Sequence, residues 1–226
     1  IQNKDTDPIR KYDHFSHVSS AEYLLQLLQL QSIDWLRQPL FQGLATSAVA
    51  GSEGLIRSSR SALVQSIQEA EDPQTAVLAI IKDLAAILGE YLQDDRFAIP
   101  VLELLAFLLD SFVTSVPDDS APRYISPICR LQCILTSNSL RKLFVLIQRA
   151  HFKSSNIARL EAAVRAYAPL SRIEQLHTEV IKKMTALLLH PFPRVSLTIP
   201  SAACTANQSR YATLWPSIYS WRRGLK

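Results

Sequence analysis

The sequence is short of glycine, of cysteine and of strand-like alternation. Its 226 residues include five glycines and three cysteines, and no run alternates apolar and polar residues over the length of a strand. We therefore predict an all-α chain. A small, odd number of cysteines argues against a disulfide framework and favours a reducing compartment. No signal peptide opens the chain and its first residue is Ile1 rather than Met, so we expect a fragment whose true start is missing.

Motifs of catalytic sites are also lacking. There is no G-x-S-x-G elbow, no H-E-x-x-H and no G-x-x-x-x-G-K-[ST] phosphate loop, and Gly51-x-x-Gly54 is typical of a turn between helices. Cys129 and Cys133, four residues apart, could share a metal. No second pair supplies the other ligands of a site that needs about four, so we interpret them as small buried residues. We expect no catalytic residue, cofactor, metal or enzymatic activity.

Positive charge is concentrated at the end of the chain. The formal net charge is +4, but five cations and no acid follow Pro193, which leaves 19 basic and 20 acidic residues before it. The cations are Arg194, Arg210, Arg222, Arg223 and Lys226. We predict a nearly neutral body that does not bind nucleic acid. We predict no membrane span, because Glu103 and Asp110 interrupt the most apolar stretch.

Apolar periodicity and turn residues divide the chain into segments. We predict a linker or loop over residues 1–18, helical repeats over 19–114, a connecting loop over 115–127, helical repeats over 128–194 and an irregular basic tail over 195–226. The S-x-x-E capping box that starts at Ser19 begins a helix ending near Gln31, and a second helix begins near Pro39. A third carries apolar residues from Leu55 to Ile67 on one side.

The next two helices have clear starts. Asp72-Pro73 combines an N-cap with a first-turn proline and begins a fourth helix that ends near Leu92. Asp94-Asp95, like Asp118-Asp119, is better explained by capping than by acid–base catalysis, because adjacent side chains point differently. The fifth helix extends to Phe112. Its polar residues recur every seventh position and form one thin stripe, so the rest of it requires burial; they are Arg96, Glu103 and Asp110.

The second block repeats this organisation. We predict helices over about 127–135, 139–152 and 156–167, and a capping box at Ser171-Arg-Ile-Glu174 that begins a last helix ending by Pro191. Helix pairs then recur about every 40 residues, as in HEAT arrays. We therefore predict a HEAT/armadillo-like α-solenoid of antiparallel helix pairs, with a compact helical bundle as the alternative.

Three stretches of the sequence resemble one known family. They are the 22 residues from Gln42 to Leu63, the stretch that begins Phe97-Ala-Ile-Pro-Val-Leu-Glu-Leu-Leu, and His190-Pro-Phe-Pro-Arg194. Together they are similar to the C-terminal region of the tubulin-folding cofactor D family, over about Phe15 to Arg194. The resemblance implies a HEAT/armadillo-like solenoid of the cytoplasm, associated with microtubules, and representing only the C-terminal part of a much longer protein.

The resemblance also implies partners. Members of the family capture β-tubulin after the chaperonin releases it. They act with tubulin cofactors C and E and an Arf-like small GTPase to assemble or take apart the αβ-tubulin dimer. The cofactor is not itself a catalyst; GTP hydrolysis occurs in tubulin when cofactor C joins, so any GTPase activation belongs to the complex. Because tubulin's surface is acidic, we predict Arg57, Arg60 and Arg149 as partner-binding residues.

Two alternatives stay open. The chain could be a generic helical-repeat scaffold or adaptor for another protein cargo. Residues 195–226 depart from the family by losing periodicity and acids, so we hypothesise that they come from a wrongly assigned splice junction or reading frame. An unbroken coding exon through Val195, found by sequencing the transcript, would refute this. A membrane-surface or nucleic-acid segment is the other interpretation of this tail, since it combines aromatic and basic residues; these are Trp215, Tyr219, Trp221, Arg222 and Arg223.

Overall fold

The computed structural model describes residues 20–113 and 137–188, and these residues form helices and short connections with no strand. The all-α prediction is therefore confirmed for this part of the chain. The chain divides into two compact units, Ile1–Ala70 and Glu71–Lys226. The elements are α1 (Ser20–Leu28), the 3-10 helix η3 (Gln29–Ser32), α2 (Asp34–Ala50), α3 (Glu53–Gln68), α4 (Pro73–Glu90), α5 (Asp95–Val113), α7 (Ser137–His151), α8 (Ile157–Leu170) and α9 (Glu174–Leu188).

Several predicted features lie outside the described residues. They are the linker at 1–18, the N-cap residue Ser19, the connecting loop at 115–127, the helix at 127–135 with Cys129 and Cys133, the pair Asp118-Asp119 and the basic tail. These stay predictions.

In the first unit, α1 and α2 both pack on α3. The predicted start of the second helix at Pro39 is wrong, because α2 begins five residues earlier, at Asp34. The chain is extended at Ile33 (φ −91°, ψ 107°), and the carboxylate of Asp34 in the first turn suits the positive end of the helix dipole. Pro39 lies inside the helix, where one amide is lost but the packing of Phe41 and Leu44 on the core holds the helix.

A tight turn joins α2 to α3. Gly51 ends α2, and a Cβ atom there would lie 2.8 Å from both the Ser47 carbonyl oxygen and the Leu55 Cδ2 atom. Only glycine fits this approach. Ser52 then caps α3, since its hydroxyl accepts a hydrogen bond from the Leu55 amide at 3.4 Å. The predicted turn is confirmed at Gly51, whereas Gly54 lies within α3.

The second unit opens with the helical pair α4 and α5. The predicted start of α4 is confirmed: the Asp72 carboxylate accepts from the Gln74 amide at 3.1 Å, and Pro73 is the first residue of the helix. Asp94 caps α5 in the same way, accepting from the Arg96 amide at 2.9 Å. Only a few residues separate the two helices, so they lie antiparallel and pack on each other.

Helix α5 is buried on most of its circumference, as its thin polar stripe predicted. It packs on α4 and α8. Its buried apolar residues are Ala98, Val101, Leu102, Leu104, Leu105, Ala106, Leu108, Leu109 and Phe112. A helix covered in this way is the centre of its unit, and the two neighbours stabilise it by removing this surface from water.

Helices α7, α8 and α9 complete the unit. Asn156 caps α8 by accepting from the Ala158 amide at 3.0 Å. The predicted capping box at Ser171 is wrong, because α9 begins only at Glu174. The Ser171 amide and hydroxyl instead close the end of α8, donating to the carbonyls of Tyr167 at 2.9 Å and Ala168 at 2.7 Å. The serine is therefore a C-terminal residue of α8, held by backbone acceptors that the box pattern does not reveal.

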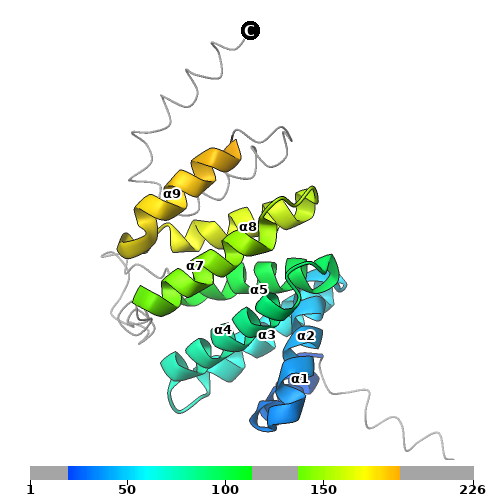
Figure 1. The fold of residues 1–226 in the computed structure, drawn as a ribbon. Helices are drawn as coiled ribbons and strands as arrows, with labels where there is room; N and C mark the ends of the chain where they lie inside the picture. Colours follow the sequence, from blue (N-terminus) through cyan, green and yellow to red (C-terminus); the bar gives the residue numbers. More distant parts are fainter. Residues whose placement is uncertain (1–19, 114–136, 189–226) are drawn as a thin grey trace, which may run out of the picture. The chain divides into compact units, whose positions relative to one another are not determined.

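The two pairs of the second unit lie against each other, α4 on α7 and α5 on α8, while α9 packs on α7 and α8 (Figure 1). Three ion pairs join α5 to α8 and to the turn that follows it: Asp95 with Arg159, Glu103 with Arg165, and Asp110 with Arg172, which lies two residues beyond the end of α8. Residue numbers rise together along both helices, so α5 and α8 run parallel. We call this set of contacts the α5–α8 junction.

The junction is buried at its start. Arg159 is 5 % exposed and donates to Asp95, to the Leu92 carbonyl at 3.0 Å and to the Ala150 carbonyl at 3.3 Å. Asn156 donates to the second oxygen of Asp95 at 2.8 Å. One guanidinium therefore joins the loop before α5, the first turn of α5 and the last turn of α7. The capping role predicted for Asp94-Asp95 holds for Asp94, whereas Asp95 serves this ion pair.

Candidate functional site

Two of the predicted partner-binding residues lie on α3 of the first unit. Arg57 is highly exposed and pairs with Glu53, one turn before it. Arg60 is half-buried, and its Nε atom donates to the Ala48 carbonyl at 3.2 Å. That carbonyl belongs to the last turn of α2, where acceptors lack partners within the helix. Arg60 thus joins two helices, and the structure leaves Arg57 the more accessible of the two.

The third predicted residue, Arg149, lies on α7 of the second unit. It shares one side of that helix with other exposed residues, since positions three, four, seven and eleven apart fall on the same face of a helix. The residues that line this face are Asn138, Arg141, Lys142, Val145, Leu146 and Arg149. The opposite side of α7 is buried and carries Leu140, Leu143, Phe144 and Ile147. The sequence places Lys142 with Arg149 among the cations of exposed helical faces, but only Arg149 is among the predicted partner-binding residues; Leu146 was missed, although the same spacing was available to find it.

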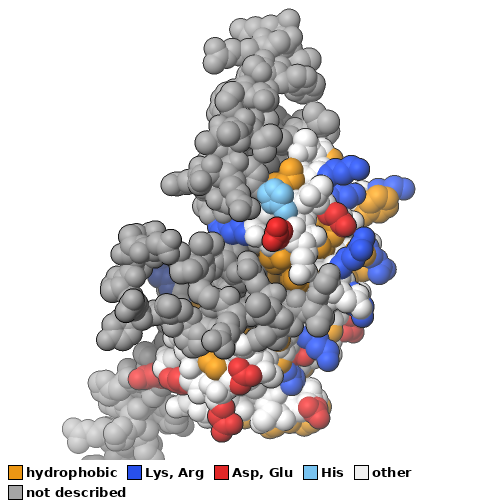
Figure 2. Space-filling model, turned by 90° about the vertical axis from the view of Figure 1, so that its left-hand side faces the viewer, with side chains coloured by type: hydrophobic (Ala, Val, Ile, Leu, Met, Phe, Trp, Pro, Cys, Tyr) orange, Lys and Arg blue, Asp and Glu red, His pale blue; other side chains and the backbone are white. Residues whose placement is uncertain are grey.

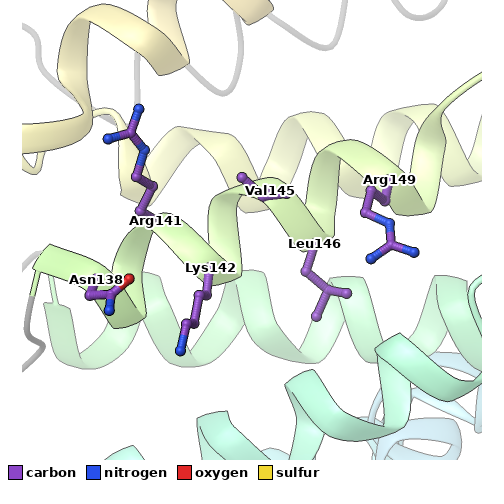
Figure 3. A pocket seen from close by; sticks show the side chains of 6 residues that line it. All are labelled: Asn138, Arg141, Lys142, Val145, Leu146 and Arg149. Atoms are coloured by element: carbon purple, nitrogen blue, oxygen red, sulfur yellow. The ribbon is translucent and has the colours of Figure 1, made fainter.

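This face borders an open groove of about 370 Å³. Lys142, Leu146 and Arg149 project toward one edge of this exposed side of α7, whereas Arg141 projects toward its other edge (Figure 3). Leu146 lies beside Gly89 of α4: a Cβ atom on that glycine would meet the Leu146 Cδ1 atom at 3.8 Å. We define Lys142, Leu146 and Arg149 as the α7 face.

The cations along α7 differ in their partners. Arg141 forms an ion pair with Glu179 of α9 at 3.3 Å. Across residues 20–113 and 137–188, no carboxylate pairs with Lys142 or Arg149. These two exposed cations are therefore available to an acidic partner.

Charge differs sharply between the two halves of the second unit. Residues 71–113 contain eight acids and two bases, whereas residues 137–188 contain three acids and nine bases. In the space-filling view, blue side chains with orange ones among them gather along the right-hand edge of the described surface (Figure 2). Val145 and Phe152 are exposed apolar residues of the basic segment, at 45 % and 69 %. The segment thus presents cations and apolar surface together.

A histidine–tyrosine contact lies inside the same segment. His151 Nε2 is 2.7 Å from the Tyr167 hydroxyl oxygen, and the two rings meet edge to face. Burial lowers the pKa of His151 to about 4, with the charge of Lys183 acting in the same direction and a backbone hydrogen bond opposing both. Burial also raises the pKa of Tyr167. Both groups are neutral near pH ~7, so the contact is a structural hydrogen bond.

The described residues contain no group of three or more His, Cys, Asp or Glu side chains placed to hold a metal ion. None of their helices combines the length and the apolar character that a membrane crossing requires.

The chain matches a known protein family. A family described as tubulin folding cofactor D C terminal matches residues 5–159, which is more than half of the chain. This range starts before the resemblance noted at Phe15 and ends within α8, so α9 lies beyond it. No curated protein and no solved structure matches the chain.

Proposed function

The chain belongs to the tubulin folding cofactor D C-terminal family, which implies a role in tubulin folding, and from this premise we propose that it is a non-enzymatic tubulin-folding module. It binds β-tubulin, and acts in the cytoplasm with tubulin cofactors C and E and an Arf-like small GTPase. Together they assemble or take apart the αβ-tubulin dimer. Protein–protein contacts carry this role, and any GTPase activation belongs to the assembled complex.

The proposal includes a HEAT-like stack of helical pairs. It is supported by the way α4/α5 and α7/α8 meet, with equivalent helices in contact and α5 parallel to α8. The paired residues of the junction are 62 to 64 apart in sequence. This offset exceeds the ~40-residue repeat of HEAT arrays by about the length of residues 114–136. Such stacks bury their core between neighbours and leave long helical faces for partners.

The three residues proposed to bind the partner are not equally well supported; they are Arg57, Arg60 and Arg149. Arg149 has most, because it is exposed beside an open groove and belongs to a basic segment. Arg57 is exposed but already paired with Glu53, and Arg60 joins α3 to α2. We therefore assign the main contact to the α7 face.

A generic scaffold or adaptor for another cargo is the second candidate. The observation that favours it is the charge of residues 137–188, because nine bases against three acids would attract any acidic protein. The two candidates differ in selectivity, since a tubulin cofactor discriminates among acidic proteins by shape and a general adaptor does not.

Co-purification with the full chain tests the proposal. We expect the immobilised 226-residue chain to retain β-tubulin and the Arf-like GTPase, and to prefer β-tubulin to an unrelated protein of similar negative charge. Circular dichroism of the same sample must show a helical spectrum, so that loss of binding is not loss of fold. Equal retention of both acidic proteins favours the adaptor. Retention of neither by a helical chain contradicts both functions.

A further inference from the structure

The α5–α8 junction contains a repeated geometric unit. Arg165 lies on α8 and Arg172 two residues beyond its end; these two cations, seven residues apart, pair with Glu103 and Asp110, which lie seven residues apart on α5. The two carboxylates share one face of α5, because seven residues make nearly two turns. The chain itself thus contains two cations, seven residues apart in sequence, that receive two carboxylates of one helix.

Helix α7 repeats the cationic half of this unit. Lys142 and Arg149 are also seven residues apart, both are exposed, and they project from the same side of the helix with Leu146 between them (Figure 3). Within the described residues, neither cation has a carboxylate partner of the kind that Arg165 and Arg172 have. The basic half of a junction is present on α7, and its acidic half is not supplied by those residues.

The space beside Leu146 suits an apolar side chain. Leu146 lines the groove of about 370 Å³, and its neighbour Gly89 on α4 has no side chain to cover it. Glu179 is already paired with Arg141, which projects away from Lys142 and Arg149 (Figure 3). The α7 face therefore offers a charge at each end and an apolar contact in the middle.

We propose that Lys142, Leu146 and Arg149 form a docking face for an acidic helix of a partner protein. The partner helix carries two carboxylates seven residues apart, with an apolar side chain midway that enters the groove beside Gly89. The inference rests on the proposed function only in taking the partner to be a protein; it goes further by naming the chemistry of the contact. An acidic helix fits better than a nucleic-acid strand or an anionic membrane, because the face is about 11 Å long and apolar at its centre.

Designed helices provide the probe. A fluorescent, side-chain-stapled helix of about 15 residues carries two glutamates seven residues apart with a leucine between them, and is titrated with the full chain at low salt. A second peptide of the same composition places the glutamates on opposite faces. We expect the matched peptide to bind at least about fivefold more tightly than the mismatched one. Charge reversal of Lys142→Glu with Arg149→Glu weakens the matched peptide by at least about tenfold.

Two controls separate this contact from general attraction. Lys182→Glu changes the charge of an exposed residue on α9, two positions from the buried Val180 and so on the opposite side of that helix, and is expected to leave the affinity within about twofold. Gly89→Leu changes no charge, and leucine is a better helix former than glycine. Its side chain would lie against Leu146 and occupy the space meant for the partner's apolar residue, so binding of the matched peptide should weaken by at least about fivefold.

The outcomes decide the inference. Equal affinity for both peptides, or no binding of the matched peptide up to about 1 mM, overturns it. So does tighter binding of phosphatidylserine vesicles or single-stranded DNA that Lys142→Glu with Arg149→Glu abolishes. Peptide binding without retention of β-tubulin leaves the docking face in place and removes the proposed function. Retention of β-tubulin without a preference for the matched peptide supports the proposed function and overturns the docking face.

Discussion

The two halves of the second unit differ more in charge than in architecture. Both contain an antiparallel pair of helices, yet residues 71–113 carry a net charge of −6 and residues 137–188 a net charge of +6, from eight acids and two bases against three acids and nine bases. Three ion pairs of the α5–α8 junction use part of this difference. The cations left over lie on α7 and α9 and in the loop after α7. Complementary charge therefore joins the two halves at the junction, and the remaining cations leave a basic surface on the second half.

The junction itself changes along its length. The side chain of Arg159 is 6 % exposed, that of Arg172 is 14 % and that of Arg165 is 49 %. An ion pair in contact with water contributes little to stability, whereas removal of one partner from a buried pair is costly. Most of the stabilisation therefore comes from the Arg159 pair at the start of the junction. The two outer pairs mainly fix how α8 is oriented on α5.

The largest expected effect is at Arg159. Arg159→Ala leaves Asp95 and the carbonyls of Leu92 and Ala150 without this donor, so the free energy of unfolding should fall by about 2–4 kcal/mol in urea titration. Arg57→Ala, which breaks the exposed pair with Glu53, is the control and should change it by less than about 0.5 kcal/mol. Similar losses for both would contradict the difference drawn between buried and exposed pairs.

Acid should weaken the basic segment through His151. Its pKa is about 4 in the folded chain against 6.5 for the unperturbed group, so the unfolded state takes up the proton first as the pH falls. Stability is retained above pH ~6.5 and lost as the pH falls toward ~4; between pH ~7 and ~5 the loss is about 2 kcal/mol. His151→Gln should remove this part of the pH dependence in urea titrations at the two pH values. An unchanged profile in the variant would rule out His151 as the source.

A smaller effect is expected at the outer end of the junction. Arg172→Ala removes the pair with Asp110, whose side chain is 58 % exposed, and should lower the free energy of unfolding by about 0.5–1.5 kcal/mol. Thermal unfolding of this variant beside Arg159→Ala measures how much more the start of the junction contributes to stability than its outer end. If Arg172→Ala lowers the free energy of unfolding as much as Arg159→Ala, the two ends of the junction stabilise the chain equally, which contradicts the difference drawn between them.

The smallest effect is expected at Arg141. Its pair with Glu179 has side chains 67 % and 47 % exposed, so Arg141→Ala should cost less than about 0.5 kcal/mol. The difference from the unchanged chain should vanish near 1 M salt, where the Debye length is about 3 Å. A loss that persists in high salt would show that Arg141 stabilises α9 by packing rather than by charge.

Local signals predicted most of the fold. Apolar periodicity located α3, α4 and α5, and the thin polar stripe of α5 predicted its burial, because these patterns depend on neighbours in sequence. The cap at Asp72 followed from the same kind of signal. The predictions fail where a local pattern fits two structures. Proline suits a helix start, but Pro39 lies inside α2; serine suits an N-cap, but Ser171 closes the end of α8.

The candidate site was less predictable, because it depends on contacts between distant residues. Asp95 and Arg159 are 64 residues apart, and nothing local distinguishes this aspartate from the capping residue before it. A usable signal was present in the equal spacing of Glu103 with Asp110 and of Arg165 with Arg172. The exposure of Lys142 and the open edge at Gly89 required the packing of α7 on α4.

Retention of β-tubulin by charge variants of the full chain tests the central claim most directly. We predict that the unchanged chain and Lys182→Glu retain β-tubulin equally, and that Lys142→Glu with Arg149→Glu reduces retention by at least about tenfold while the circular dichroism spectrum stays helical. If the unchanged, helical chain retains no more β-tubulin than an unrelated protein of similar negative charge, the account of a tubulin-folding module is contradicted.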